Sequence, residues 1–152
     1  MNKYEEEITK NFSVDAETAE AEFYRFAEAW QIDVFADTMS DEQEEEFLEL
    51  KRKIITPLRR GSALVDESGD IIYTLQKPFK NSDGAITLEK FHLKRPAGRH
   101  WSAMDGIGNT KSIKKMMSFY AAVLGVTPAT LNKLDGLDMR IIQSVYTLFL
   151  SS

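Results

Sequence analysis

The first sixty residues carry hydrophobic positions at helical spacing. A first stripe recurs every three or four positions, which is the period of a helix with one buried face, at Ala16, Ala19, Phe23, Phe26, Trp30 and Val34. Ser13 or Asp15 can cap its start. A second stripe, with Pro57 and Gly61 predicted to mark its end, holds Phe47, Leu50, Ile54 and Leu58. The pattern predicts two antiparallel helices, a helical hairpin.

The start of the second helix and the charges around it agree with this prediction. Ser40 followed by Gln43 fits a capping box, in which each side chain bonds the other residue's free backbone amide. Residues 1–60 contain 16 acidic and 8 basic residues, whereas residues 61–152 contain 8 acidic and 11 basic ones. Two helices with acidic outer faces explain this asymmetry, and a hairpin of this kind can supply solubility or self-association.

The next thirty residues alternate between apolar and polar positions, as strands do. Segments 62–66 and 70–76 flank a turn that contains Gly69, and Pro78 is predicted to end the second of them. A third strand is predicted over 85–94. Its apolar positions change parity after Leu88, which predicts a bulge near Glu89–Lys90. These segments predict a three-stranded antiparallel sheet.

The remainder of the chain carries the starts and stops of several helices. A short helix is predicted over 97–105, a longer one from Thr110 to Leu124, a second short helix after Thr127-Pro128, and a last helix capped by Asp135. The expected fold class is α+β, with an N-terminal helical hairpin, a small three-stranded antiparallel sheet and a C-terminal helical cluster. The expected division is an acidic helical extension over 1–61 and an α+β domain over 62–152.

Composition narrows the possible functions. The chain has 152 residues and no cysteine, which excludes disulfides and thiolate metal sites. The N-terminus lacks the basic and apolar regions of a secretory signal, and no apolar run approaches the ~20 residues that span a bilayer. A soluble protein of the cytoplasm, without a membrane association, is expected.

No catalytic or cofactor-binding pattern is present in the sequence. His92 and His100 lack an HxxxH or HExxH partner, so surface or capping roles are expected for them and no metal site is predicted. Asp135 and Asp138 are explained by capping of the last helix. There is neither a glycine-rich phosphate loop nor a nucleophile–base pair, so the chain is not expected to be an enzyme and no cofactor is predicted.

Two segments suggest partners. Methionines and aromatic residues adapt to varied apolar surfaces, so Met116, Met117, Phe119 and Tyr120 are the candidate partner-binding residues, although an all-round buried helix would explain them too. The segment 124–131 is similar to a helix-turn-helix, which makes a DNA-binding regulator the alternative function. Against DNA, the short helix offers only Asn132 and Lys133 before acidic residues, and the whole chain carries a net charge of −5. A general adaptor with an unrelated partner is the third possibility.

A series of motifs runs along residues 70–150, and these motifs are structural rather than catalytic. They are Leu75-Gln76-Lys77-Pro78-Phe79, Asp83-Gly84, Leu93-Lys94-Arg95-Pro96, Leu124-Gly125-Val126, Leu131-Asn132-Lys133-Leu134-Asp135, Asp138 and a terminal Val145 with Phe149-Leu150. Their order resembles the Mu-like tail assembly chaperones of phages and prophages. Ala97 and His100 stand where the family has a threonine and an aspartate that cap a helix. The capping of that helix is therefore expected to differ.

The resemblance implies a non-catalytic chaperone that acts during tail morphogenesis. Such proteins bind the long, helical tape measure protein and help to bring tail tube subunits to it. They work in the cytoplasm of the host bacterium and are not expected in the mature virion. An adaptable amphipathic surface that covers the apolar stripe of a partner helix is compatible with this role.

Overall fold

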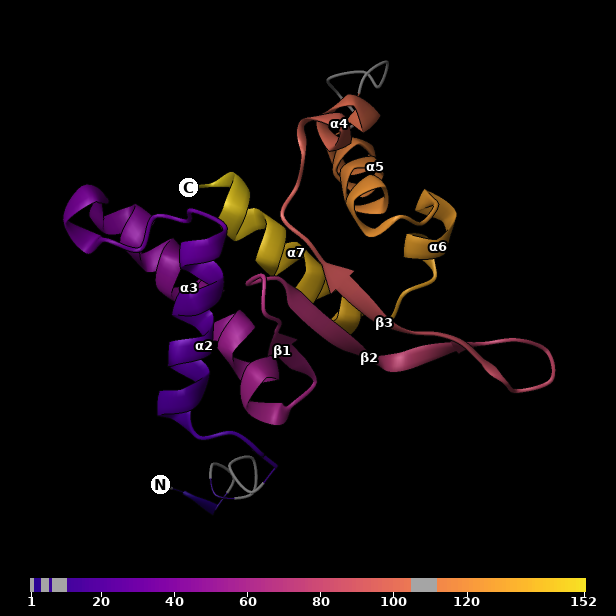
Figure 1. Cartoon of the computed structure of the whole chain (residues 1–152), viewed down its shortest axis with the longest axis horizontal. Helices are drawn as coiled ribbons and strands as arrows, with labels where there is room; N and C mark the ends of the chain where they lie inside the picture. The colour runs from indigo at the N-terminus through magenta and orange to yellow at the C-terminus, as the bar shows by residue number, and fades with distance from the viewer. Residues whose placement is uncertain (1, 4–5, 7–10, 105–111) are drawn as a thin grey trace.

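The computed structural model describes residues 2–3, 6, 11–104 and 112–152. Its helices and strands, with η for 3-10 helices, are α2 (Ala16–Ala29), η1 (Ala36–Thr38), α3 (Asp41–Arg60), β1 (Ala63–Val65), β2 (Ile71–Lys80), β3 (Ile86–Leu93), α4 (Gly98–Trp101), η2 (Ser102–Met104), α5 (Ser112–Leu124), α6 (Pro128–Asn132) and α7 (Gly136–Leu150). Helix α7 crosses the middle of the molecule, with α2 and α3 on one side and α4 to α6 on the other (Figure 1). This arrangement confirms the predicted α+β fold class.

Helix α2 begins where the sequence predicts and ends earlier. The Asp15 carboxylate accepts the backbone N–H of Thr18 at 2.7 Å and caps the helix. The prediction that the helix reaches Val34 is wrong, because Gln31 adopts a left-handed backbone with φ of 58°. The N–H of Ile32 then bonds the carbonyl of Ala27 at 2.9 Å, which closes the helix in a Schellman-type turn.

Helix α3 starts with the predicted capping box. The Ser40 hydroxyl accepts the Gln43 N–H at 3.2 Å, and the Gln43 side chain accepts the Ser40 N–H at 2.9 Å. Gly61 ends the helix with a φ of 80°, which glycine adopts without a steric penalty. Pro57, in contrast, lies inside the helix, and its prediction as an end marker is wrong.

The three strands form an antiparallel meander in the order β1-β2-β3. Strand β2 runs to Lys80, so the prediction that Pro78 ends it is wrong. Proline is tolerated there because the pairing with β3 is interrupted: Thr74 pairs with Lys90, and the next pair is Phe79 with Leu88. The predicted irregularity near Glu89–Lys90 is confirmed, but its extra residues belong to β2.

The amides that lose ladder partners in this bulge are satisfied from α7. The side chain of Asp138, which is completely buried, accepts the N–H groups of Gln76 at 2.8 Å and Lys77 at 3.2 Å. It also accepts the Tyr73 hydroxyl at 2.5 Å. Asp138 therefore joins the first turn of α7 to the middle of β2, whereas capping falls to Asp135, which accepts the Leu137 N–H at 3.0 Å.

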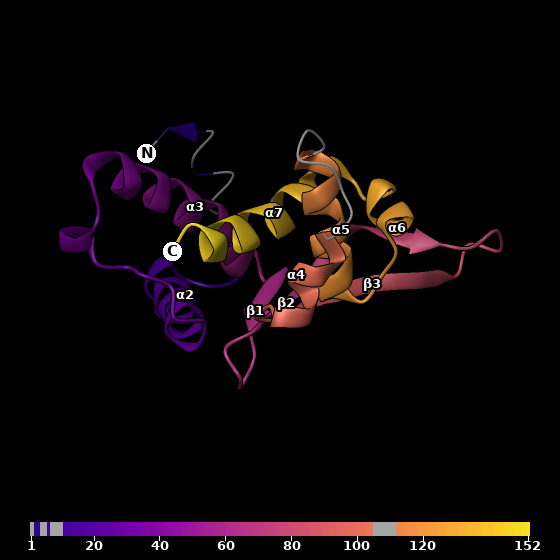
Figure 2. The same ribbon diagram turned by 90° about the horizontal axis from the view of Figure 1, so that it is seen from above.

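One hydrophobic cluster contains residues from the helical hairpin, the sheet and the C-terminal helices. Trp30 is its largest fully buried side chain. The indole ring lies 5.7 Å from the rings of both Tyr146 and Phe149, and the indole N–H donates to Asp70 at 2.9 Å. Contacts between α3 and α7 add to this packing (Figure 2). The division after residue 61 stays a prediction, and the core continues across it.

The C-terminal helices follow the predicted order. The predicted helix over 97–105 appears as α4 followed by η2, and residues 105–111, including Thr110 as a helix start, lie outside the described part. Gly125, with φ of 72°, follows α5, and the Thr127 hydroxyl caps α6 by accepting the Thr130 N–H at 3.2 Å. None of the helices in the described part of the chain is long and apolar enough to cross a membrane.

His100 caps helix α4, whose capping was predicted to differ because Ala97 and His100 replace a threonine and an aspartate. It is only 4% exposed, so a surface role is wrong, whereas the capping role is confirmed. Its Nδ1 accepts the backbone N–H of Ala97 at 2.8 Å, just before α4. A ring nitrogen can accept this bond only when it carries no proton.

Acid is expected to destabilise the protein through His100. Burial, with Arg99 and Lys94 nearby, lowers the pKa of His100 below its ordinary 6.5. As the pH falls below about 6.5, the unfolded chain therefore binds more protons at this position than the folded chain does. The stability that neutral His100 contributes is progressively lost as the pH falls further. Urea midpoints measured between about pH 8 and about pH 5 should fall more for the wild type than for H100Q, whose amide oxygen can still accept the Ala97 N–H. Equal decreases of the urea midpoint for the wild type and H100Q would contradict the role of neutral His100 in this pH dependence.

Candidate partner-binding groove

An apolar groove lies along α5 beside α7. It has a volume of about 160 Å³, and its lining comprises Ser112, Ile113, Met116, Met117, Tyr120 and Gln143. Ile113 is 80% exposed, the two methionines are half-buried, and Tyr120 is buried. We refer to these six residues as the α5 groove.

Three of the four candidate partner-binding residues line the α5 groove, namely Met116, Met117 and Tyr120. Phe119 does not: it is fully buried and lies 5.0 Å from the ring of Trp101 and 6.1 Å from that of Tyr146. Phe119 lies six positions after Ile113, which turns the helix by about 240°, so the two side chains project from different sides of α5. Phe119 thus anchors α5, while the groove faces outward.

Of the three groove residues that were not predicted, Ser112, Ile113 and Gln143, the apolar one is Ile113. It belongs to the same stripe as Met116 and Tyr120, at positions i, i+3 and i+7, and such a stripe is normally assigned to the core. One signal in the sequence could have identified it: α5 has apolar residues on more sides than a single core can cover, so some of them must be exposed. A stripe with that spacing matches the anchors that an amphipathic partner helix would use.

The chemistry of the groove is apolar and adaptable. Methionine has three rotatable bonds and a polarizable thioether, so Met116 and Met117 can follow partners of different shape. Burial raises the pKa of the Tyr120 hydroxyl, so this side chain carries no charge near neutral pH. The groove can bury apolar side chains, and it offers no nucleophile–base pair.

A second exposed apolar surface lies at the far end of the helical hairpin. We call it the N-terminal apolar surface and define it by Tyr24, Val34, Phe35 and Leu48. Phe35 is 66% exposed and Leu48 52% exposed. Two hollows of about 540 Å³ and about 180 Å³ lie beside these residues. Exposed apolar area of this kind is typical of interaction sites.

One group of potential metal ligands is formed by Asp66, Asp70 and His92. Their contacts with one another and with the fold account for all three. Asp66 accepts the Ser68 and Asp70 N–H groups in the β1–β2 turn, at 2.9 and 3.0 Å. Asp70 accepts the indole N–H of Trp30, and the imidazole Nε2 of His92 lies 2.8 Å from its other oxygen. These side chains tie the turn to β3 and α2, and nothing in their arrangement requires a metal.

The structure adds no support to the helix-turn-helix alternative. Helix α6 has five residues, which is little more than one turn. Asn132 and Lys133 are exposed at its end, but Asp138 is buried against β2 and Asp135 caps α7. A recognition helix has to present several polar side chains to base edges, and a single turn offers few of them.

Comparison with known proteins finds a family match for the part of the chain that contains the α5 groove. A family model described as phage tail assembly chaperone proteins, E, or 41 or 14, matches residues 72–151. Neither a curated protein nor a solved structure matches the chain. The matched residues include nearly all of β2 and all of β3 and α4 to α7, so they contain the whole α5 groove. The N-terminal apolar surface lies outside them.

Proposed function

The chain belongs to the phage tail assembly chaperone family, and from this premise we propose that it binds the tape measure protein and helps to recruit tail tube subunits. The observation that carries the proposal is the exposed α5 groove inside the matched segment. The chain acts without catalysis, in the cytoplasm of the host bacterium, and leaves before the virion is complete.

The groove fits the chemistry of a long helical partner. A tape measure protein that waits for its tube exposes apolar stripes, which aggregate unless they are covered. Ile113, Met116 and Tyr120 present a complementary stripe at helical spacing, and the half-buried methionines can adjust to successive turns of a partner helix. Binding of this kind is reversible, as release before tail completion requires.

A chaperone that brings tube subunits to the tape measure protein needs a second contact surface. The N-terminal apolar surface supports this part of the proposal, because Phe35 and Leu48 are exposed there. Its residues belong to the helical hairpin, whereas most residues of the α5 groove belong to α5. Helices α2 and α3 lie on one side of α7 and α5 lies on the other (Figure 1). The two partners could therefore be held at the same time.

Charged residues in the groove are expected to abolish capture of the tape measure protein. In I113E/M116E, two carboxylates would be buried without partners on binding, which is costly. The amount of tape measure protein that co-purifies with the tagged chain from co-expressing cells should fall by about tenfold or more.

The matched control is I86E on the β2–β3 hairpin, where the wild-type isoleucine is 52% exposed. It adds an acid at an exposed apolar position far along the chain from the groove and should leave capture unchanged. Circular dichroism should show that both variants remain folded. Undiminished capture by I113E/M116E would reject the groove as the binding surface. Absence of capture by the wild type would reject the proposed function itself.

A further inference from the structure

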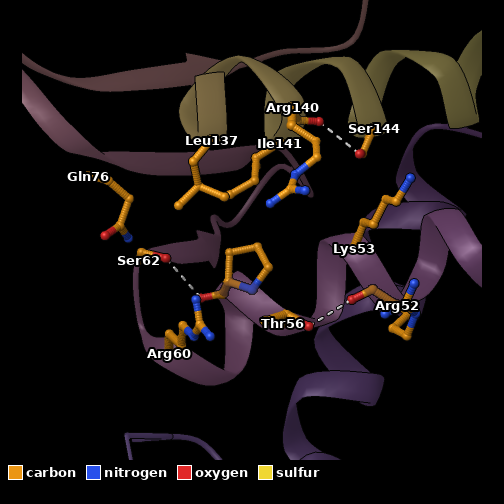
Figure 3. A pocket seen from close by; sticks show the side chains of 11 residues that line it. Arg52, Lys53, Thr56, Arg60, Ser62, Gln76, Leu137, Arg140, Ile141 and Ser144 are labelled. Atoms are coloured by element: carbon orange, nitrogen blue, oxygen red, sulfur yellow. Dashed lines mark hydrogen bonds between the residues drawn. The ribbon is translucent and has the colours of Figure 1, made fainter. Parts of the chain in front are cut away.

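A cationic cavity of about 240 Å³ lies between the C-terminal half of α3 and the start of α7. Four basic side chains line it: Arg52, Lys53 and Arg60 from α3, and Arg140 from α7. Leu137 and Ile141 of α7 add apolar surface (Figure 3). Two elements that are distant in sequence thus bring cations to one cavity in a protein whose net charge is −5.

The cations of this cavity are poorly compensated. Among the described residues, Lys53 has a carboxylate within ion-pair distance, that of Glu49 at 3.5 Å. No carboxylate within the described part of the chain forms an ion pair with Arg52, Arg60 or Arg140. Like charges that converge on a hollow repel one another, and an anion placed between them relieves that repulsion.

The helix dipole explains only part of this arrangement. Arg60 lies in the last turn of α3, where the negative end of the helix favours a cation. Arg140 lies near the start of α7, where the positive end offers it no such stabilisation. Its presence at the cavity therefore points to an anionic group that comes from outside the chain.

A matching anionic segment is present on α3 itself. The first half of the helix, Asp41–Glu49, contains six acidic residues. Glu42 and Glu45 are exposed and form no ion pair with any other described residue. Glu45 lies seven positions, or about two turns, before Arg52, so both face the same side of the helix.

We propose that a second copy of the chain fills the cavity with its own acidic half of α3. Two α3 helices that pack antiparallel place Glu42 and Glu45 of each copy against Arg52, Arg60 and Arg140 of the other. The contact is isologous, so it closes as a two-fold dimer. A long polyanion such as nucleic acid fits less well, because it would also meet the acidic half of the same helix.

Charge reversal on either half should dissociate the dimer. In R52E/R140E or in E42K/E45K, like charges face each other twice across the two-fold axis. Sedimentation equilibrium of the full chain at low ionic strength should show a dimer for the wild type and a dissociation constant raised about tenfold or more for each variant. Salt should weaken the wild-type dimer, because these charges are exposed.

The decisive experiment mixes the two charge-reversal variants. A heterodimer of R52E/R140E with E42K/E45K has opposite charges in both contact zones, so the mixture should recover the wild-type mass. The matched control for R52E/R140E is K80E/K90E, which makes the same change of net charge on the β2–β3 hairpin and should leave dimerisation unchanged. Three results would overturn the proposal. The wild type could be a monomer, the dimer could survive both charge reversals, or a monomer could bind inorganic phosphate or an oligonucleotide in a way that depends on Arg52.

Discussion

Replacing Asp138 by alanine is expected to lower the free energy of unfolding by about 3–5 kcal/mol, because the buried carboxylate is the acceptor for three donors. The variant leaves the amides of Gln76 and Lys77 without this partner at a part-buried site, and the hydroxyl of Tyr73 without it in the core. Strand β2 cannot recover these bonds from β3, since the ladder is interrupted at that point. Urea unfolding followed by circular dichroism measures the loss.

Two companion variants separate this effect from a general effect of losing a carboxylate. D83A removes an exposed acid from the turn between β2 and β3, and should change stability by no more than about 0.5 kcal/mol. Y73F removes one donor while the two amides stay bonded, so its cost should be smaller than that of D138A. A loss below about 1 kcal/mol for D138A would show that water or a local rearrangement satisfies the bulge.

The second large effect is expected from Trp30. The W30A variant should lose about 3–5 kcal/mol, which is the usual range for removing a large aromatic side chain from a core. Trp30 is 1% exposed and contacts α7 through Tyr146 and Phe149. Its removal therefore weakens the helical hairpin and the family-matched segment together, which a chemical denaturation curve can show.

The chain offers a matched control in its other tryptophan. Trp101 is 44% exposed and lies against Phe119, so W101A leaves a smaller cavity and should cost less than about 2 kcal/mol. Equal costs for the two substitutions would contradict the central position of Trp30. Two separate unfolding transitions would show that the segments before and after residue 61 fold independently.

The elements of the fold were predictable where a local rule determines them. The capping box of Ser40 and Gln43 and the left-handed Gly61 depend on neighbouring residues alone, and both are found. The end of α2 at Gln31 was missed because a glutamine with positive φ has no distinctive sequence signal. The role of Asp138 was missed because it depends on which strand lies against α7, and its acceptor contacts span more than sixty residues of sequence.

The candidate site was only partly predictable for a related reason. Helix α5 has apolar residues on several sides, so spacing alone does not decide which side meets the core. Packing against Trp101 and Tyr146 places Phe119 inside and leaves Ile113 outside. The cationic cavity was likewise not visible in sequence, because Arg140 joins Arg52 only after α7 packs on α3.

The most direct test of the proposed function is the solubility of the tape measure protein that the chain is proposed to bind. It should be expressed in bacteria alone, with the wild-type chain, and with I113E/M116E. The tape measure protein should be mainly insoluble alone, become soluble in complex with the wild type, and return to the insoluble fraction with the groove variant. A tape measure protein whose solubility is the same in all three cases would contradict it.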